Sequence, residues 1–110
     1  MQRVNEKEQS YRHGDSGPKY LMRGPRFAWG IIRLKAGEKM GRHGHKEVEE
    51  TFYFFEGAPT LLVNETPQRV REGDVFRLEP GERHDIVNDT PAPIRVIFIK
   101  TPYLPEDKIN

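Results

Sequence analysis

Short apolar runs alternate with turn residues along most of the chain, and this pattern predicts a series of β-strands. The runs are rich in β-branched and aromatic residues, and glycine, proline or asparagine separates them at intervals of about 8 to 12 residues. The predicted strands are 27–34, a segment carrying His43 and His45, 50–55, 60–63, 68–71, 75–78, 84–88 and 94–99, with a hairpin tip at 64–67. No segment keeps a helical period, so the pattern predicts an all-β sandwich or barrel.

The two ends of the chain are less regular than the middle. Residues 1–17 are polar and charged, which predicts a short edge strand or a loosely held arm, and 17–25 is predicted as a short extended segment between turns. The proline-containing tail 101–110 is extended, and it can pack as a strap across the barrel or a partner. We expect a single domain over 1–110, with an arm and short strands at 1–26, a barrel at 27–100 and a tail at 101–110.

Composition narrows the function classes. The 110 residues are 35% apolar and 32% charged, and the formal net charge of +1 gives no general attraction to nucleic acid or membranes. The absence of cysteine excludes disulfides and thiolate metal sites. No N-terminal apolar segment resembles a signal peptide and no apolar run could span a bilayer, so we expect a cytoplasmic protein with no membrane partner.

One stretch carries the clearest chemistry. His43 and His45 lie two apart, so on a strand both imidazoles would point to one face. The carboxylates of Glu47, Glu49 and Glu50 follow, and any of them could join the two histidines. Imidazole and carboxylate together suit a divalent transition metal, namely Fe, Mn, Zn, Ni or Cu.

A second constellation lies further along the chain, and the two together resemble the motifs of the cupin superfamily. In this sequence the first motif corresponds to Gly37, His43, His45, Glu50 and Gly57, and the second to Gly73, Gly81, His84 and Asn88. Both Glu49 and Glu50 lie at an acceptable distance from His45, but only Glu50 leaves the motif's six residues before Gly57. The second motif departs once, because Glu79 holds the usual proline position and Pro80 follows it.

The resemblance implies a small single-domain cupin, whose fold is a jelly-roll barrel or double-stranded β-helix. It implies a metal held by His43, His45, Glu50 and His84 at the wide mouth of the barrel, and it implies a homodimer. It does not imply one reaction, because cupins include dioxygenases, decarboxylases, isomerases, sugar-binding domains and seed-storage proteins.

The residue pattern supports the metal site independently. Glu50, Phe52 and Phe54 share one face of their predicted strand, so the carboxylate faces the interior with two phenylalanines. An unpaired charge is costly there, and metal coordination would stabilise it. Glu49 points the other way and is expected to be a solvated surface charge.

Other polar residues receive more ordinary interpretations. Asn88 is expected to make a hydrogen bond at a turn or strand end, and His13 to be solvated. Most of Arg33, Arg77 and Arg95 should point outward from their strands, although an inward arginine would suit a carboxylate or phosphate. The candidate core or pocket residues are Phe27, Trp29, Met40, Arg42, Phe52, Phe54, Phe76 and Phe98.

These patterns support two main function hypotheses. The first is a metal-dependent enzyme that acts on a small oxygen-bearing substrate, such as a sugar derivative, a carboxylate or an enolisable ketone, as a dioxygenase or an isomerase. The second is a non-catalytic barrel that binds or senses a metal or small ligand. A metal-free scaffold is a third reading, which the full ligand set disfavours. The sequence names no separate catalytic acid or base.

Overall fold

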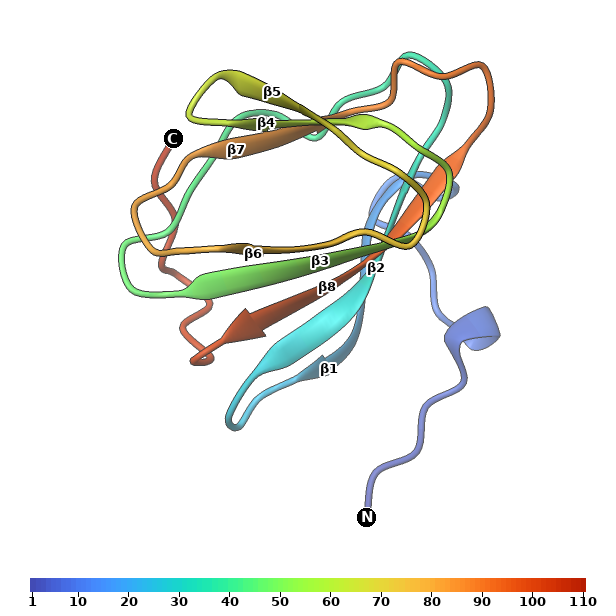
Figure 1. The fold of residues 1–110 in the computed structure, drawn as a ribbon. Coiled ribbons are helices and arrows are strands. Elements are labelled where there is room, and N and C mark those ends of the chain that lie inside the picture. Colours follow the sequence, from blue (N-terminus) through green and yellow to red (C-terminus); the bar gives the residue numbers. More distant parts are fainter.

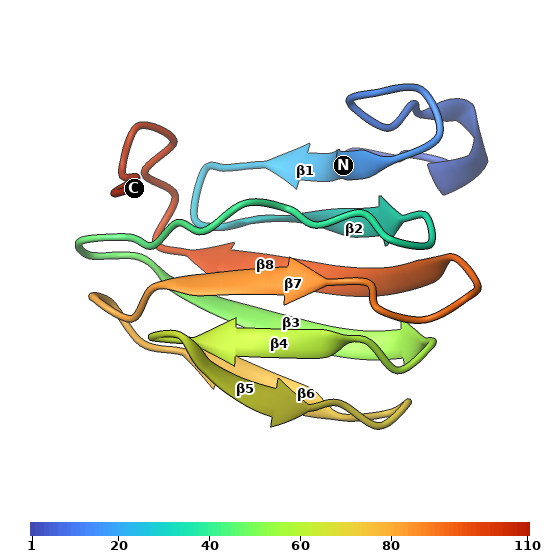
Figure 2. The same ribbon diagram turned by 90° about the horizontal axis from the view of Figure 1, so that it is seen from above.

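The computed structural model describes residues 1–110 as two antiparallel sheets that face each other (Figure 1). The larger sheet contains, in spatial order, β1 (Gly17–Arg23), β2 (Ala28–Leu34), β8 (Ile94–Thr101), β3 (Glu49–Glu56) and β6 (Val75–Leu78). The smaller sheet contains β5 (Thr66–Arg69), β4 (Thr60–Val63) and β7 (His84–Val87). Seen from above, the strands of the two layers run in similar directions (Figure 2). The predicted all-β jelly-roll barrel is confirmed.

Alternation of side chains along the strands builds the core between the two sheets. On β3, Phe52 and Phe54 are fully buried whereas Tyr53, between them, is exposed. The buried cluster consists of Ile32, Leu34, Phe52, Phe54, Leu61, Val70, Leu78, Ile86, Ile94, Val96 and Phe98. Burial of each large apolar side chain stabilises the fold by about 1.5–3 kcal/mol.

Most of the predicted core residues lie in or against this cluster. Phe76 and Met40 are partly buried and pack against it. The prediction for Phe27 is wrong, because β2 begins one residue later and Phe27 is 47% exposed. Trp29 pairs with Ile99, which is exposed, so the indole lies on the outer face of the larger sheet.

The hairpin between β4 and β5 is tighter than the sequence pattern predicted. Asn64 and Glu65 alone form the turn, with φ values of 48° and 70°, and Val63 pairs directly with Thr66. The second strand therefore covers Thr66–Arg69 in place of 68–71. Pro67 is tolerated because β5 is an edge strand, where a missing backbone donor can face away from the sheet.

The segment carrying His43 and His45 is not a regular strand, contrary to the prediction. It runs beside β7 and pairs at isolated positions, Lys39 with Val87 and His43 with His84. Between them the Gly41 amide donates to the Asp85 carboxylate at 2.9 Å, and Gly41 has a φ of 101°. A side-chain acceptor and a left-handed glycine thus interrupt the ladder.

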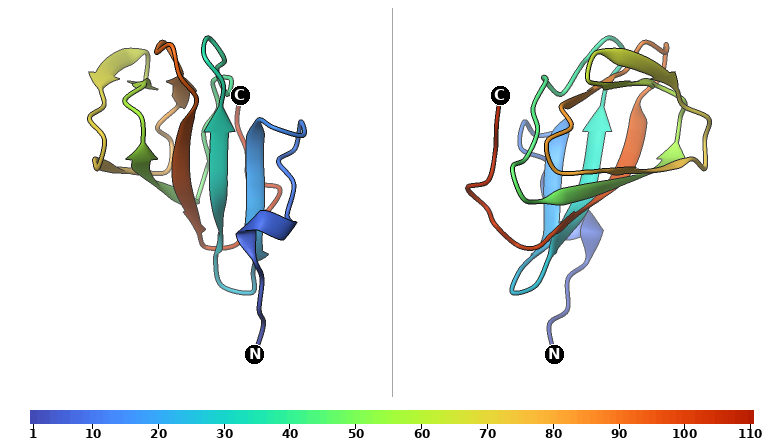
Figure 3. Two further views of the ribbon diagram at one scale, coloured as in Figure 1. Left: turned by 90° about the vertical axis from the view of Figure 1, so that its right-hand side faces the viewer. Right: turned by 60° about the vertical axis from the view of Figure 1, so that its left-hand side comes forward.

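The N-terminal arm lies beside β1 at the edge of the larger sheet (Figure 3). It contains a short 3-10 helix, η1 (Glu6–Glu8), whose Glu6 carboxylate accepts a 2.6 Å hydrogen bond from the Lys19 ammonium. The Lys19 side chain is 4% exposed and also lies 4.1 Å from the centre of the Tyr11 ring. These contacts hold the arm, and the edge strand begins only at Gly17. The structure has no helix of the length and apolarity that crossing a membrane requires.

Candidate metal centre

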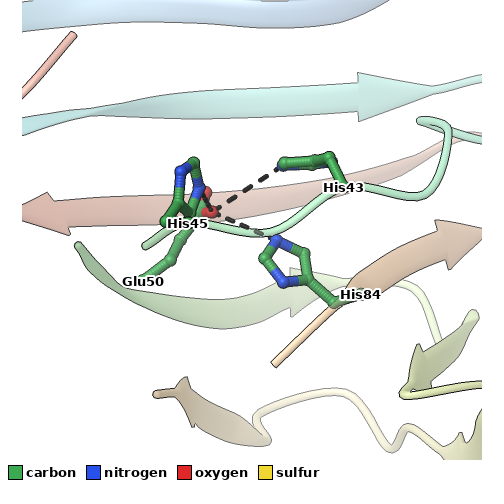
Figure 4. Close-up of side chains that lie close together, drawn as sticks. All are labelled: His43, His45, Glu50 and His84. Atoms are coloured by element: carbon green, nitrogen blue, oxygen red, sulfur yellow. Dashed lines mark hydrogen bonds and ion pairs between the residues drawn. The ribbon is translucent and has the colours of Figure 1, made fainter. Parts of the chain in front are cut away.

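Four side chains from distant parts of the chain converge on one point (Figure 4). His43 and His45 come from the segment before β3, Glu50 from β3 and His84 from the first position of β7. The Nε2 atoms of His45, His84 and His43 lie 3.0, 3.2 and 4.0 Å from Glu50 Oε1. All four residues are buried, and each offers one ligand atom within 4.8 Å of the others.

Backbone pairing brings the two halves of this cluster together. The amide of His43 donates to the carbonyl of His84 at 3.0 Å, and the amide of His84 donates back at 2.7 Å. Such a reciprocal pair places two side chains opposite each other, and the two imidazole centres are 4.5 Å apart. The pairing across more than forty positions of chain explains why neither motif forms the cluster alone.

Backbone carbonyls orient two of the three imidazoles. Nδ1 of His45 donates to the Asp107 carbonyl at 2.5 Å, and Nδ1 of His43 donates to the Gly41 carbonyl at 3.1 Å. Because a carbonyl only accepts, these bonds direct Nε2 of each ring toward the cluster. Nδ1 of His84 is buried without a partner, and packing holds that ring edge-on against Phe52 with centres 5.4 Å apart.

The electrostatics of the cluster centre on Glu50. Burial alone would raise the pKa of this carboxyl, but hydrogen bonds from His45 and His84 and the nearby Lys100 charge lower it to about 2. Burial lowers the pKa of His43. Burial also acts against charge on His45, but its hydrogen bonds to Glu50 and the Asp107 carbonyl outweigh this and raise its pKa.

The donor set fits a divalent transition metal. Three imidazole nitrogens and one carboxylate oxygen are ligands that Fe, Mn, Zn, Ni and Cu all accept. A buried carboxylate with three rings aimed at one of its oxygens is costly unless a cation or protons balance it. The cluster is therefore able to hold a metal ion, and the assignment of the four residues as ligands stays a prediction. Glu49 lies outside the cluster, on the opposite face of β3.

The comparison with protein families agrees with this geometry. The family model described as the cupin domain matches residues 30–100. The chain belongs to the cupin family. The resemblance inferred from the two sequence motifs is thus confirmed.

Relatives of this cupin extend the comparison. It is 30% identical over 81 residues to the tetracenomycin polyketide synthase protein TcmJ of Streptomyces glaucescens, which aligns 74% of this chain with 54% of that protein. This cupin spans about half the length of the curated relative that it matches.

Two solved structures share its fold. A protein with a double-stranded β-helix domain from Klebsiella pneumoniae has a TM-score of 0.81 and 16% identity, over 94% of this chain and 91% of that chain. A sugar phosphate isomerase of the cupin superfamily from Silicibacter pomeroyi has a TM-score of 0.74 and 24% identity, over 91% and 75% of the two chains. At these identities the likeness shows the fold.

A cavity of about 370 Å³ opens beside the cluster of this cupin. His43, His45 and Glu50 contribute to its wall, and the predicted candidates Met40, Arg42 and Phe98 line it as well. Its size is that of a pocket for a small molecule. The cluster therefore faces a space that a ligand could enter.

Sequence reasoning missed several residues at this cavity. Lys100 is in phase with Val96 and Phe98, which point inward, so alternation along 94–101 could have found it. Arg23 could not have been found in this way, because a bulge between Tyr20 and Met22 shifts the phase of β1.

The remaining polar predictions concern residues away from the cluster. The Asn88 amide donates to the carbonyls of Leu34 and Ala92, which confirms a strand-end role. Arg33, Arg77 and Arg95 all lie on the outer side of their strands, and Arg77 and Arg95 bond to acidic side chains there. His13 is exposed, as expected, although it lies at the edge of the cavity.

Proposed function

We propose that this cupin is a metal-dependent enzyme that acts on a small oxygen-bearing substrate, such as a sugar derivative, a carboxylate or an enolisable ketone. One observation carries the proposal: the buried cluster of three histidines and one glutamate opens onto a cavity large enough for such a molecule. A metal site of purely structural use would be closed by protein ligands and would need no adjoining space.

The residues of the chain have defined roles in this proposal. His43, His45, Glu50 and His84 would hold the metal, and Glu50 would supply the single negative charge of the ligand set. A bound divalent ion would polarise a substrate oxygen as a Lewis acid, and a redox-active ion would add oxygen chemistry. The carbonyls of Gly41 and Asp107 fix the direction of two imidazoles, and the apolar neighbours Phe52 and Phe98 keep water from the inner side.

The names of two relatives support an oxygen-bearing ligand. One relative is named for a polyketide synthase, and a structural neighbour is a sugar phosphate isomerase. An isomerisation is therefore one candidate for this chain, and a redox-active ion in the cluster would make an oxygen-dependent reaction another. A barrel that binds its ligand without turnover is the alternative, and it would use the same residues.

We also propose that two copies of this cupin associate. Tyr53, Val75 and Ile99 are 41%, 62% and 37% exposed. Tyr53 pairs with Val75 on one side and Ile97 on the other, and Ile97 shares the outer face of β8 with Ile99. These side chains therefore lie near one another on the outer face of the larger sheet. Contiguous exposed apolar side chains are typical of protein interfaces.

Metal analysis of three variants tests the metal centre. Protein without a histidine tag should contain close to one equivalent of a transition metal, and Glu50→Gln and His84→Ala should weaken metal binding at least tenfold. Glu49→Gln is the control, because that carboxylate adjoins Glu50 but lies on the other face of β3, and it should keep wild-type affinity.

The outcome also separates the two functions. Metal below about a tenth of an equivalent after reconstitution would contradict both the enzyme and the metal-binding barrel. If metal binds, the next measurement is turnover of sugar derivatives, carboxylates and ketones. Turnover that is lost in Glu50→Gln and kept in Glu49→Gln would support the enzyme hypothesis. Tight ligand binding without turnover would favour the binding barrel.

A further inference from the structure

A row of side chains crosses the inner face of the larger sheet at the level of Glu50. Reading from β1 to β3, the cross-strand partners in this row are Arg23, Ala28, Lys100 and Glu50. Lys100 therefore stands beside Glu50 on the next strand, and both side chains line the cavity. Ala28 has only a methyl group, so little side-chain volume separates Arg23 from Lys100.

The neighbouring row explains how β1 reaches this position. Tyr20, Gly30 and Phe98 are cross-strand partners there. A Cβ atom at Gly30 would lie 2.1 Å from the Lys19 carbonyl oxygen, so only glycine allows β1 to approach β2 this closely. Without a side chain between them, the rings of Tyr20 and Phe98 meet edge-on with centres 5.0 Å apart.

Three polar groups from this part of the sheet converge. The Lys100 ammonium donates to the Tyr20 hydroxyl at 2.7 Å, and the Arg23 guanidinium stacks 3.9 Å from the centre of the Tyr20 ring. Because the Tyr20 oxygen accepts from Lys100, its own proton remains free for another acceptor. The structure gives that proton no protein partner, and none of the three groups bonds to a carboxylate.

The cavity as a whole has more positive charge than its own acids can balance. Its wall includes six basic residues, namely Arg12, Arg23, Lys39, Arg42, Lys100 and Lys108, but only three acidic ones, namely Glu38, Glu50 and Asp107. Arg42 pairs with Glu65, and none of the other five has a carboxylate oxygen within 4.0 Å.

The three acidic side chains of the cavity wall already interact with groups other than these basic residues. Glu38 accepts from the Lys35 amide, Asp107 accepts from backbone amides of the loop before β3, and Glu50 belongs to the histidine cluster. A cavity wall with surplus cations favours an anionic ligand, because field lines concentrate in a recess. The surplus cannot be inferred from the net charge of +1.

We propose that Arg23, Tyr20 and Lys100 form a subsite for an oxyanion, a carboxylate or phosphate group of the substrate. The proposal rests on the proposed function, in that the same small molecule would present its reacting oxygen to the cluster around Glu50. The guanidinium supplies a planar fork, the ammonium a point charge and the hydroxyl one further donor. The substrate class is thereby narrowed from oxygen-bearing compounds to acidic ones.

Calorimetric titration with three probes tests the subsite. Metal-loaded protein is titrated at low ionic strength with malonate, with inorganic phosphate and with malonamide, which has the shape of malonate without its charge. At least one of the two oxyanions should bind at least tenfold more tightly than malonamide, and the better oxyanion indicates whether the natural group is a carboxylate or a phosphate.

Variants locate the binding. Lys100→Gln and Arg23→Gln should each weaken the oxyanion at least tenfold, and Arg23 is exposed, so its replacement does not disturb the core. Arg77→Gln, on the outer face of the same sheet, should stay within twofold of wild type. The subsite would be overturned if Lys100→Gln and Arg23→Gln kept oxyanion affinities within twofold of wild type. It would also be overturned if malonamide bound as tightly as the oxyanions.

Metal content measured on the same samples keeps the two proposals apart. If the protein binds one equivalent of metal but its oxyanion affinity does not depend on Lys100 and Arg23, the metal centre is supported and the subsite is overturned. Oxyanion binding that depends on Lys100 and Arg23 in protein that takes up no metal would support the subsite and contradict the metal-dependent function.

Discussion

At the scale of single residues, His45 is distinguished by lying between two acceptors. Its Nδ1 faces the Asp107 carbonyl at 2.5 Å and its Nε2 faces Glu50 Oε1 at 3.0 Å. Both contacts become hydrogen bonds only if the ring carries two protons, which is the charged form. A metal in the cluster would take the place of the proton on Nε2.

We expect the histidines of the metal-free protein to titrate in a defined order. His45 should have a pKa above 6.5, because its hydrogen bonds outweigh burial, and burial should hold the pKa of His43 below 6.5. As the pH falls through the pKa of His45, a proton occupies its cluster-facing nitrogen and metal affinity should fall. NMR titration of the imidazole protons measures both values. A His45 that titrates below His43 would contradict the expected order.

At the scale of elements, the C-terminal tail is part of the candidate metal centre. The Asp107 carboxylate accepts from the amides of Lys46, Glu47 and Val48 at 2.8, 2.7 and 2.9 Å. These three amides belong to the loop that joins His45 to Glu50, and they lower the pKa of Asp107. The predicted strap thus ties down the loop between two candidate ligands.

Removal of the Asp107 carboxylate should make the loop between His45 and Glu50 more mobile without unfolding the barrel. In Asp107→Ala, three amides lose their acceptor, so the amides of residues 46–48 should exchange with solvent faster and metal affinity should fall about tenfold. Hydrogen exchange and metal titration measure the two effects. Glu106→Ala removes an exposed neighbouring carboxylate and should change neither. Unaltered exchange in Asp107→Ala would show that the loop does not depend on the tail.

At the scale of the whole molecule, the outer face of the larger sheet is the place where association can be tested. The exposed Tyr53 and Ile99 should be covered in a dimer, so a charge there would be buried. Wild-type protein should sediment as a dimer at micromolar concentration, and Tyr53→Lys and Ile99→Lys should shift it toward the monomer. Leu104→Lys, an exposed apolar residue in the tail, is the control and should stay dimeric. A wild-type monomer at these concentrations would contradict the proposal.

The strand order along the chain and the ligand spacing could be predicted from the sequence. Alternation with a period of two identifies β2, β3 and β8 because each has one buried face, and turn residues bound them. The resemblance to the cupin motif separates Glu50 from Glu49, because only Glu50 leaves six residues before Gly57. Alternation agrees independently, since one step along a strand reverses the face. Prediction failed at the His43 segment and at the β4–β5 hairpin, where a side-chain acceptor and two left-handed residues set the local geometry.

The sequence by itself determined the all-β class and the inward face of Glu50, because these depend on local alternation. Its resemblance to the two cupin motifs supplied the barrel and the two halves of the histidine–glutamate cluster. Only the tertiary structure decided which residues surround the cluster. A bulge in β1 and the register between β3 and β8 bring Arg23 and Lys100 to the cavity beside it. Asp107 reaches it because the tail returns to the loop before β3. The packing of the whole sheet sets the register between neighbouring strands. This register brings together charged side chains that no local sequence pattern connects. The result is a positively charged cavity in a chain whose total charge is almost balanced.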